Sequence, residues 1–193
     1  EALSQQAHPE QAFPYLEKAL EQARAIVATD EGRRKYPFDV PVGLSKLAYL
    51  HSRLGRDEEA LGYFKEIQSV CEAQAAAEPD NIRTVRGIAV AYDGIARTLK
   101  NLGRMDEALD YMRKSLALSE GLAAADEVDA QALRDVYVGA AALAVVESEM
   151  ERHEDADKDF KKAIAIARRL HRQDPASGLA RGDLAVVLTN YAT

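Results

Sequence analysis

Hydrophobic and small residues recur at intervals of three and four along most of the chain, which is the period of an amphipathic helix. The first such stripe lies between Pro9 and Thr29 and consists of Ala12, Leu16, Ala19, Leu20, Ala23 and Ile26. Runs of alternating β-branched residues, which would indicate strands, are missing from the sequence. The pattern therefore predicts an all-α protein.

Glycines and prolines separate the helical stretches. Gly55 and Gly103 stand where a helix C-terminus favours a left-handed residue, and Pro79 and Pro175 close other turns. The segment 31–41, EGRRKYPFDVP, contains two prolines, so we expect at least part of it to be a loop. After the first helix, further helices are predicted at about 40–54, 57–78, 81–102, 105–126, 129–150, 153–174 and 177–193.

One stretch of sequence recurs along the chain. LGRDEEALGYF at 54–64 returns as LGRMDEALDYM at 102–112 and, more divergently, as MERHEDADKDF at 150–160. A fourth copy lies near the start, around Leu16. The copies are 48 residues apart by sequence number. A repeat period of about 20–50 residues is typical of solenoids.

Small residues occupy two equivalent places in the successive helix pairs. The place in the first helix holds Ala48, Ala96, Ala144 and Ala192, and the place in the second holds Ala12, Ala60, Ala108 and Ala156. Four residues after the latter come Leu16, Phe64, Met112 and Phe160. In this spacing of an alanine and a larger apolar residue four positions later, and in its turn glycines and closing prolines, the sequence resembles tetratricopeptide repeat proteins. The resemblance implies a right-handed superhelical solenoid of antiparallel helix pairs.

We therefore expect a single solenoid over residues 1–193. Its parts would be a helix of a partial first repeat at 9–30, repeats at about 38–78, 81–126 and 129–174, and a terminal helix at 177–193. The usual repeat of the family has about 34 residues, so each helix here would gain about seven. Because seven residues are close to two helical turns, the helices would lengthen without rotating their apolar faces.

The first helices of tetratricopeptide repeat pairs line a concave groove, where the family usually holds an extended peptide or a partner helix. Carried over to this sequence and extended backward along the same helix faces, the groove positions are Tyr49, Arg83, Arg86, Val90, Asp93, Arg97, Lys100, Arg134 and Val138. Four of the five charged residues in the predicted helix 81–102 are basic, whereas 57–78 carries six acidic residues and one lysine.

This uneven charge suggests that an acidic peptide or partner helix crosses the groove. Arg83, Arg86 and Arg97 would contact its carboxylates, and Tyr49 and Val90 would supply apolar contacts. The alternative is that each arginine is an ordinary solvated surface residue.

Composition excludes several other functions. A hydrophobic content of 47% is enough for a sizeable core, and the net charge of −7 argues against nucleic acid or anionic membranes as partners. No run of 18 apolar residues occurs, so membrane insertion is not expected. The single cysteine, Cys71, cannot form an internal disulfide or a zinc cluster. A cytoplasmic location is favoured.

The sequence contains no constellation of catalytic residues. A glycine-rich phosphate loop, an HExxH pair and a nucleophile elbow are all missing. His153 and Asp157 lie one helical turn apart, but their position at a helix start favours surface residues over metal ligands. Cys71 aligns with small residues of the other repeats, which indicates a packed core thiol. We therefore expect no catalytic residues, no metal and no cofactor.

The sequence thus favours a non-catalytic scaffold that binds a protein or peptide. A first alternative is self-assembly as a homodimer, because the terminal helix would expose Leu184, Leu188 and Tyr191 on an uncovered apolar face. A second is a regulatory array of a larger bacterial signalling protein, since RGDLAVVL at 181–188 resembles elements of long repeats beside signalling domains.

Overall fold

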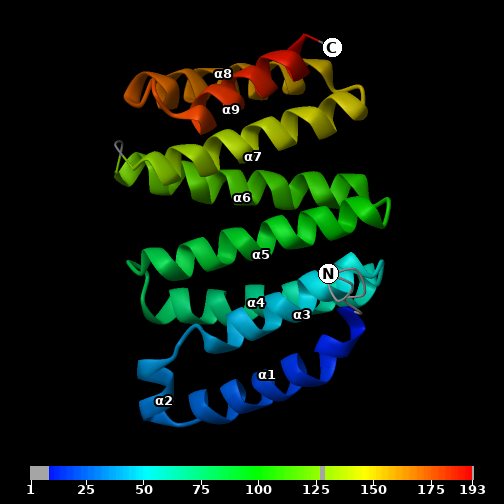
Figure 1. Cartoon of the computed structure of the whole chain (residues 1–193), viewed down its shortest axis with the longest axis vertical. Coiled ribbons are helices and arrows are strands. Elements are labelled where there is room, and N and C mark those ends of the chain that lie inside the picture. The colour runs from blue at the N-terminus through cyan, green and yellow to red at the C-terminus, as the bar shows by residue number, and fades with distance from the viewer. Residues whose placement is uncertain (1–8, 127–128, 193) are drawn as a thin grey trace, which may run out of the picture. The chain divides into compact units, whose positions relative to one another are not determined.

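The computed structural model describes residues 9–126 and 129–192, and every regular element within them is a helix (Figure 1). The predicted all-α class is confirmed. After the 3-10 helix η1 (Pro9–Ala12), the α-helices are α1 (Phe13–Val27), α2 (Asp30–Lys35), α3 (Asp39–Arg53), α4 (Asp57–Ala77), α5 (Ile82–Asn101), α6 (Met105–Ala125), α7 (Ala130–Glu149), α8 (His153–Gln173) and α9 (Gly178–Tyr191). The chain divides into two compact units, unit 1 up to Arg104 and unit 2 from Met105.

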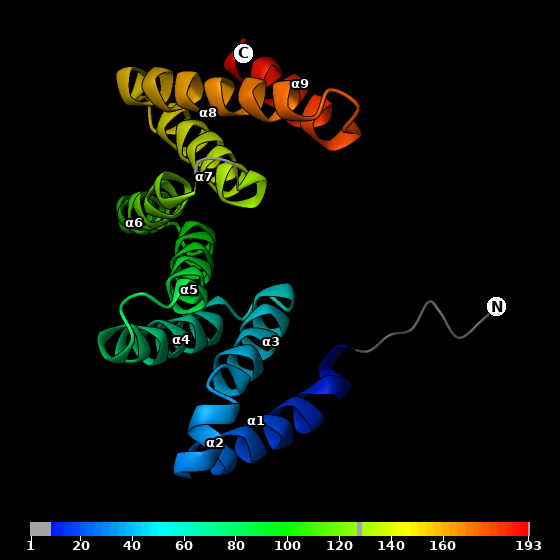
Figure 2. The same cartoon turned by 90° about the vertical axis from the view of Figure 1, so that its left-hand side faces the viewer.

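Unit 1 contains η1 and helices α1 to α5. Helix α3 packs against both α1 and α4, and α4 packs in turn against α5 (Figure 2). The long helices are amphipathic, so each buries one stripe, and Leu44, Leu47, Phe64, Ile67 and Ile95 are among the largest fully buried side chains. Cys71 is buried in this unit, as the sequence predicted for a core thiol.

A short helix occupies residues 31–35 of the segment 31–41, part of which the sequence predicted to be a loop. Helix α2 begins after Thr29, whose Oγ1 accepts a hydrogen bond from the backbone N–H of Gly32 at 2.9 Å. Acidic residues in the first turn and basic residues in the last complement its dipole. The predicted loop is therefore confined to residues 36–38.

Three equivalent turns share one backbone conformation. Gly55 and Gly103 have φ angles of 71° and 75°, as the sequence predicted for left-handed residues at helix ends. Glu151 adopts the same region with φ of 59°, although a side chain disfavours it by about 1 kcal/mol. After each turn residue, the next backbone N–H donates to a carbonyl five residues back, as Arg152 does to Glu147 at 2.8 Å. The turn geometry therefore persists where the glycine is lost.

The contact between α4 and α5 depends on a glycine within a helix. A Cβ atom added at Gly94 would lie only 2.2 Å from Cδ1 of Phe64, closer than real Cβ contacts allow. Glycine, which has no Cβ, is therefore needed where α5 crosses the Phe64 ring. Gly87 makes a similar, looser approach, because its added Cβ would lie 2.9 Å from Sγ of Cys71.

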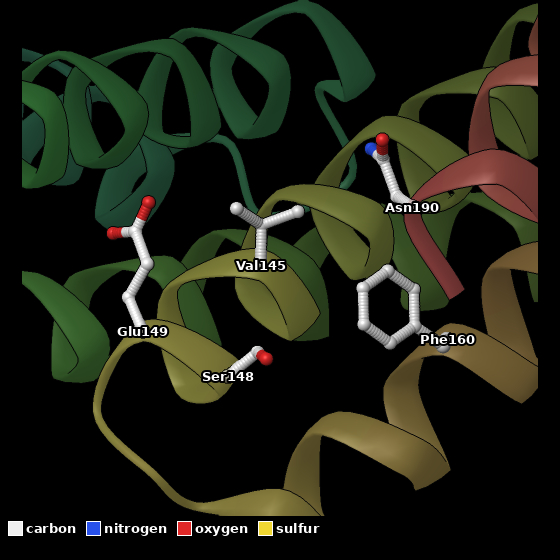
Figure 3. Close-up of a pocket in the computed structure, with 5 residues that line it drawn as sticks. All are labelled: Val145, Ser148, Glu149, Phe160 and Asn190. Carbon is white, nitrogen blue, oxygen red and sulfur yellow. The ribbon is translucent and has the colours of Figure 1, made fainter. Parts of the chain in front are cut away.

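Unit 2 contains helices α6 to α9. Helix α7 packs against α6 and α8, and α8 packs against α9. Their buried side chains form one hydrophobic cluster that includes Leu133, Leu143, Phe160 and Val187. The Tyr137 hydroxyl donates a hydrogen bond to the backbone carbonyl of Asp183 at 2.9 Å and so ties α7 to α9. Figure 3 shows Phe160 of α8 close to residues of α7 and α9.

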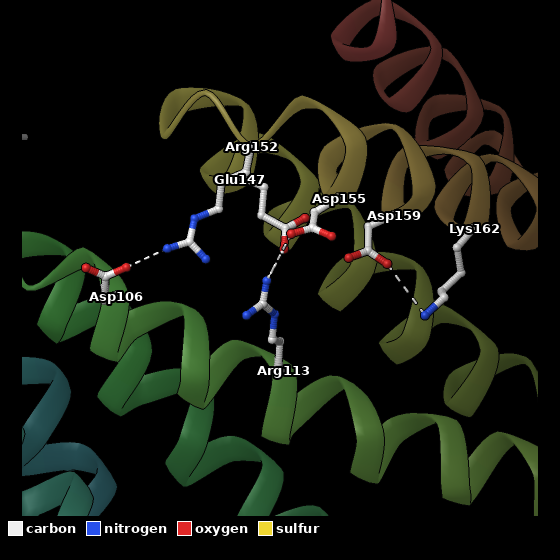
Figure 4. Close-up of polar contacts among 7 residues, drawn as sticks. All are labelled: Asp106, Arg113, Glu147, Arg152, Asp155, Asp159 and Lys162. Carbon is white, nitrogen blue, oxygen red and sulfur yellow. Dashed lines mark hydrogen bonds and ion pairs between the residues drawn. The ribbon is translucent and has the colours of Figure 1, made fainter.

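A buried carboxylate lies in unit 2 where α7 meets α6 and α8 (Figure 4). The side chain of Glu147 is 1% exposed, and its Oε1 accepts a hydrogen bond from Nη2 of Arg113 at 2.8 Å. Its other oxygen, Oε2, accepts no hydrogen bond from the described residues. Burial raises the pKa of Glu147, and the hydrogen bond from Arg113 opposes this only in part. Arg113 also lies 3.6 Å from a carboxylate oxygen of Asp155.

We predict that Gly94→Ala destabilises unit 1, because the new methyl group would overlap the Phe64 ring and overpacking costs about 1–3 kcal/mol. Urea unfolding followed by circular dichroism measures the change. Gly62→Ala is the matched control, because a Cβ at this helical position has no neighbour within 4 Å. This control should stabilise the protein by about 0.5–1 kcal/mol through helix propensity. Equal effects of the two substitutions would contradict the close contact.

We also predict that Glu147 makes stability decrease as the pH rises from 4.5, the usual pKa of glutamate, to the raised pKa in the folded protein. Between these values the folded state binds more protons than the unfolded chain, so the free energy of unfolding falls with rising pH. Each unit of difference between the two pKa values corresponds to about 1.4 kcal/mol.

The measurement is the melting temperature of wild type and Glu147→Gln between pH 4.5 and 7. Wild type should gain stability relative to the variant as the pH is lowered, because glutamine does not titrate. A difference between wild type and Glu147→Gln that is constant with pH would contradict the assignment.

Candidate functional site

The predicted groove residues of unit 1 lie on α3 and α5. Tyr49 on α3 and Val90 on α5 are 39% and 43% exposed, although both are large hydrophobic residues. Val42 on α3 is exposed as well. Unit 1 therefore leaves an apolar strip uncovered on the helices for which the sequence predicted a groove. We call the exposed residues of α3 and α5, together with Phe38 just before α3, the α3/α5 face.

Two of the predicted arginines stack on aromatic rings of this face. The guanidinium carbon of Arg83 lies 4.1 Å from the centre of the Phe38 ring, and that of Arg97 lies 4.9 Å from the centre of the Tyr49 ring. The Tyr49 ring in turn meets Phe64 edge-on, with ring centres 5.3 Å apart. Cation–π contacts of this kind contribute about 0.5–1 kcal/mol at exposed sites. They also hold both guanidinium groups over the face.

The stacked arginines keep hydrogen-bonding capacity. Both side chains are exposed, and neither has an ion-pair partner among the residues that the structure describes. A guanidinium that stacks through its flat side still presents N–H donors at its edge. The two groups can therefore bind carboxylates without first breaking an ion pair with a described residue.

The other charged groove positions of unit 1 are less available. Arg86 and Lys100 are half-buried, whereas Asp93 is exposed, and all three interact with other groups of the protein. The structure thus separates the predicted basic cluster into two stacked arginines and two cations with other contacts.

The remaining predicted positions belong to unit 2. Val138 on α7 is 51% exposed. Arg134 instead forms a bidentate ion pair with Asp183 of α9. Its Nη1 donates to Oδ2 of Asp183 at 2.5 Å, and its Nη2 donates to Oδ1 at 3.1 Å. Both side chains of this pair are largely buried. Since Asp183 occupies the Arg134 donors, the pair contributes to the packing of α7 against α9 and not to the site proposed below.

Sequence reasoning missed two features. Phe38 lies in the turn before α3, outside the helical pattern from which the groove positions were taken, yet it stacks with Arg83. A pocket of about 280 Å³ in unit 2 was also missed, and Figure 3 shows its lining. It is lined by Val145, Ser148, Glu149, Phe160 and Asn190. Comparing residue sizes at equivalent repeat positions would have indicated this pocket.

A second cavity of about 280 Å³ lies between α1 and α3 of unit 1. Its lining includes Leu16, Ala19, Val42 and Lys46. Val42 belongs to the α3/α5 face, so the apolar strip of that face continues toward α1.

The described residues offer little support for other chemistry. No group of three or more histidine, cysteine, aspartate or glutamate residues among them could hold a metal ion. Asp157, once a possible ligand with His153, accepts hydrogen bonds from Lys161 and from the Tyr191 hydroxyl, and these lower its pKa. Burial raises the pKa of Cys71 to about 11, so its thiol remains protonated and is a poor nucleophile.

None of the described helices is both long enough and apolar enough to cross a membrane.

The sequence of residues 88–126 and 140–175 matches the tetratricopeptide repeat family model. The first match covers most of α5 and all of α6, and the second covers the later half of α7 and all of α8. No curated protein matches the chain in sequence.

Solved structures that match the chain include BtubC and MamA. BtubC (BKLC) from P. vanneervenii shares 19% identity with a TM-score of 0.67, over 96% of this chain and 65% of that protein. MamA shares 14% identity with a TM-score of 0.41, over 97% of this chain and 96% of that one. The chain therefore spans 65% of the length of BtubC, and at this identity the likeness shows the fold alone.

The family match and the fold together support a tetratricopeptide repeat protein, from a family whose members generally act as non-catalytic scaffolds that bind protein partners.

Proposed function

We propose that the protein is a non-catalytic scaffold and that the α3/α5 face binds an acidic peptide segment or helix of a partner protein. The observation that carries the proposal is the stacking of Arg83 on Phe38 and of Arg97 on Tyr49. Both guanidinium groups belong to one unit, and both rest on aromatic residues at or just before α3.

The stacking favours binding because it orders the arginines in advance. A long side chain loses about 0.5–1.5 kcal/mol of conformational freedom when a partner immobilises it. Part of this cost is already met in the free protein where a ring holds the guanidinium in place. Carboxylates are the expected ligands, since guanidinium groups bind them through paired, charge-assisted hydrogen bonds.

The apolar part of the face defines the rest of the partner. Val42, Tyr49 and Val90 are exposed hydrophobic residues on the same two helices as the arginines. An acidic segment that also carries apolar side chains would cover them and gain about 25 cal/mol for each Å² of apolar surface buried. We therefore expect acidic and aliphatic residues to alternate in the partner.

The helix bounds support a 48-residue repeat unit. Helices α4, α6 and α8 begin at Asp57, Met105 and His153, and α5, α7 and α9 begin at Ile82, Ala130 and Gly178. Both series advance by 48 residues at each step. We infer that the chain is one series of lengthened tetratricopeptide repeats.

A labelled peptide of alternating glutamate and valine tests the acidic-partner proposal by fluorescence anisotropy. We expect Arg83→Ala combined with Arg97→Ala to weaken binding about tenfold, which corresponds to about 1.4 kcal/mol. Binding should also weaken with added salt, because exposed charges are screened.

The control variant Lys18→Ala with Lys65→Ala removes the same charge from exposed positions on α1 and α4 and should change the affinity by less than about twofold. A glutamine–valine peptide should bind more weakly than the glutamate–valine peptide. No binding of the glutamate peptide to wild type, or equal losses in both double variants, would contradict the proposal.

Self-assembly through α9 is a second candidate function. Leu179, Val186, Leu188 and Tyr191 are exposed hydrophobic residues on this helix, and no helix follows it in the part of the chain that the structure describes. Leu184, which the sequence analysis assigned to the same exposed face, is instead half-buried and packs against the core of unit 2. The apolar residues of α9 that are available to a second copy are therefore Leu179, Val186, Leu188 and Tyr191.

We predict that, if α9 pairs two copies, light scattering will show a dimer whose fraction increases with protein concentration. Val186→Glu combined with Leu188→Glu should shift the protein to monomer, because two buried charges would lose their hydration. Ala165→Glu, at an exposed position of α8, is the control and should leave the dimer unchanged. A monomer at every concentration would exclude this function.

A further inference from the structure

Helix α1 leaves one apolar side uncovered. By sequence position it corresponds to α4 and α8, the second helices of the pairs α3/α4 and α7/α8, which pack against a helix on each side. Ala19 of α1 is exposed, whereas its equivalents Ile67 in α4 and Ala163 in α8 are buried. Ile26 is exposed too, and its equivalent Leu170 is buried. Since α1 still packs against α3, the uncovered side is the one that faces the first helix of the same pair in α4 and α8.

The cavity of about 280 Å³ between α1 and α3 lies on this side of α1. Leu16 and Lys46 line it, and their equivalents in unit 2, Phe160 and Asn190, line the pocket there. In unit 2 the other lining residues come from α7, the first helix of its pair (Figure 3). In unit 1 no α-helix among the described residues takes the place equivalent to α7. The cavity therefore marks the surface of α1 and α3 that suits a first helix.

Helix α9 has the complementary property. It corresponds to the first helices α3 and α7, and it packs against the second helix before it, α8. Tyr191 of α9 is 42% exposed, whereas its equivalent Leu47 in α3 is 1% exposed. Leu188 is also exposed, and its equivalent Leu44 is fully buried. The uncovered side of α9 is thus the one that faces the second helix of the same pair in α3 and α7.

The residue types on the two uncovered sides fit each other. At two equivalent positions the pair α3/α4 has Leu47 and Phe64, both fully buried, and α7/α8 has the same two residue types. Tyr191 on α9 and Leu16 on α1 again combine an aromatic ring with a leucine, with the places exchanged. A contact between α9 and α1 would therefore bury side chains of about the same total volume as a complete pair, as close packing requires.

We propose that α9 of one copy of the protein docks on the uncovered side of α1 of a second copy. The two helices form the pair that each lacks, and burial of apolar surface drives the contact. Each surface belongs to one unit, α1 to unit 1 and α9 to unit 2. The proposal rests on the self-assembly function above and names the surface that receives α9. Because different surfaces meet, the contact is heterologous and can extend beyond two copies.

Sedimentation velocity of the full chain between about 1 μM and 1 mM tests the contact, for which we expect a dissociation constant on the order of 100 μM or lower. The average mass of wild type should increase with concentration. Ala19→Glu on α1 and Leu188→Glu on α9 should each weaken self-association at least about tenfold, because each places a charge in the apolar contact. Both positions are exposed, so both variants should fold, and melting curves verify this.

A mixture of the two variants separates this contact from a pairing of two α9 helices. The Ala19→Glu protein retains an intact α9, and the Leu188→Glu protein retains an intact α1. One wild-type contact can therefore form between them, and we expect a 1:1 complex with wild-type affinity that does not grow further. Pairing of two α9 helices predicts instead that the Ala19→Glu protein associates with itself as wild type does.

Two control variants introduce the same charge on the other sides of the two helices. Val186→Glu lies on α9 at a position whose equivalents Val90 and Val138 are exposed in the preceding repeats. Ala25→Glu lies on α1 at a position whose equivalent Ala73 is exposed in α4. Both controls should associate with the affinity of wild type.

Three results would overturn the proposal. These are a wild-type protein that stays monomeric up to about 1 mM, undiminished association of Ala19→Glu, and a mixture of the two variants that forms no complex. The second result would leave self-assembly through α9 in place, as pairing of two α9 helices. Binding of the glutamate–valine peptide can be measured separately on the Leu188→Glu protein, whose α3/α5 face is intact.

Discussion

The close approach of neighbouring helices is the constraint on which the structure depends. Ala60 and Ala96 are buried at the small-residue positions of α4 and α5, and Gly94 leaves room for the Phe64 ring. A larger side chain at any of these places would force the helices apart, and the lost contacts would not be recovered elsewhere, since each repeat packs only on its neighbours. Small residues at fixed intervals are therefore a condition for stacking the long helices.

This packing leaves one side of the first helices free. In α3 and α5 the buried stripe takes up residues such as Leu47 and Ile95, and exposed residues such as Tyr49 and Val90 remain on the surface. The arginines on that surface do not extend freely into solvent, because aromatic rings hold two of them in place. If these arginines bind a partner as proposed, their partial ordering would lower the entropic cost of binding.

Much of the fold could be predicted from the sequence, because helix periodicity, turn glycines and small residues are local signals that repeat. The short helix α2 was not predicted, because its only sequence signal is the capping residue Thr29 before a segment with two prolines. The sequence placed the predicted groove residues on helices, but it did not show which other residues their side chains contact. Arg134 finds its partner, Asp183, 49 residues later on α9, and no periodic pattern indicates which exposed acid meets which base.

The equivalence of repeat positions explains how one scaffold can present two kinds of surface. Tyr49, Arg97 and Val145 occupy the same place in α3, α5 and α7, outside the alanine and glycine positions of the close helix contacts. Tyrosine and arginine at this place stack on each other in unit 1, whereas valine in unit 2 opens a pocket beside Phe160. Because the close helix contacts rest on alanine and glycine elsewhere in the repeat, side chains of different size occur at this place. Under the proposed function, partner preference would depend on residues outside the close helix contacts, separately in each unit.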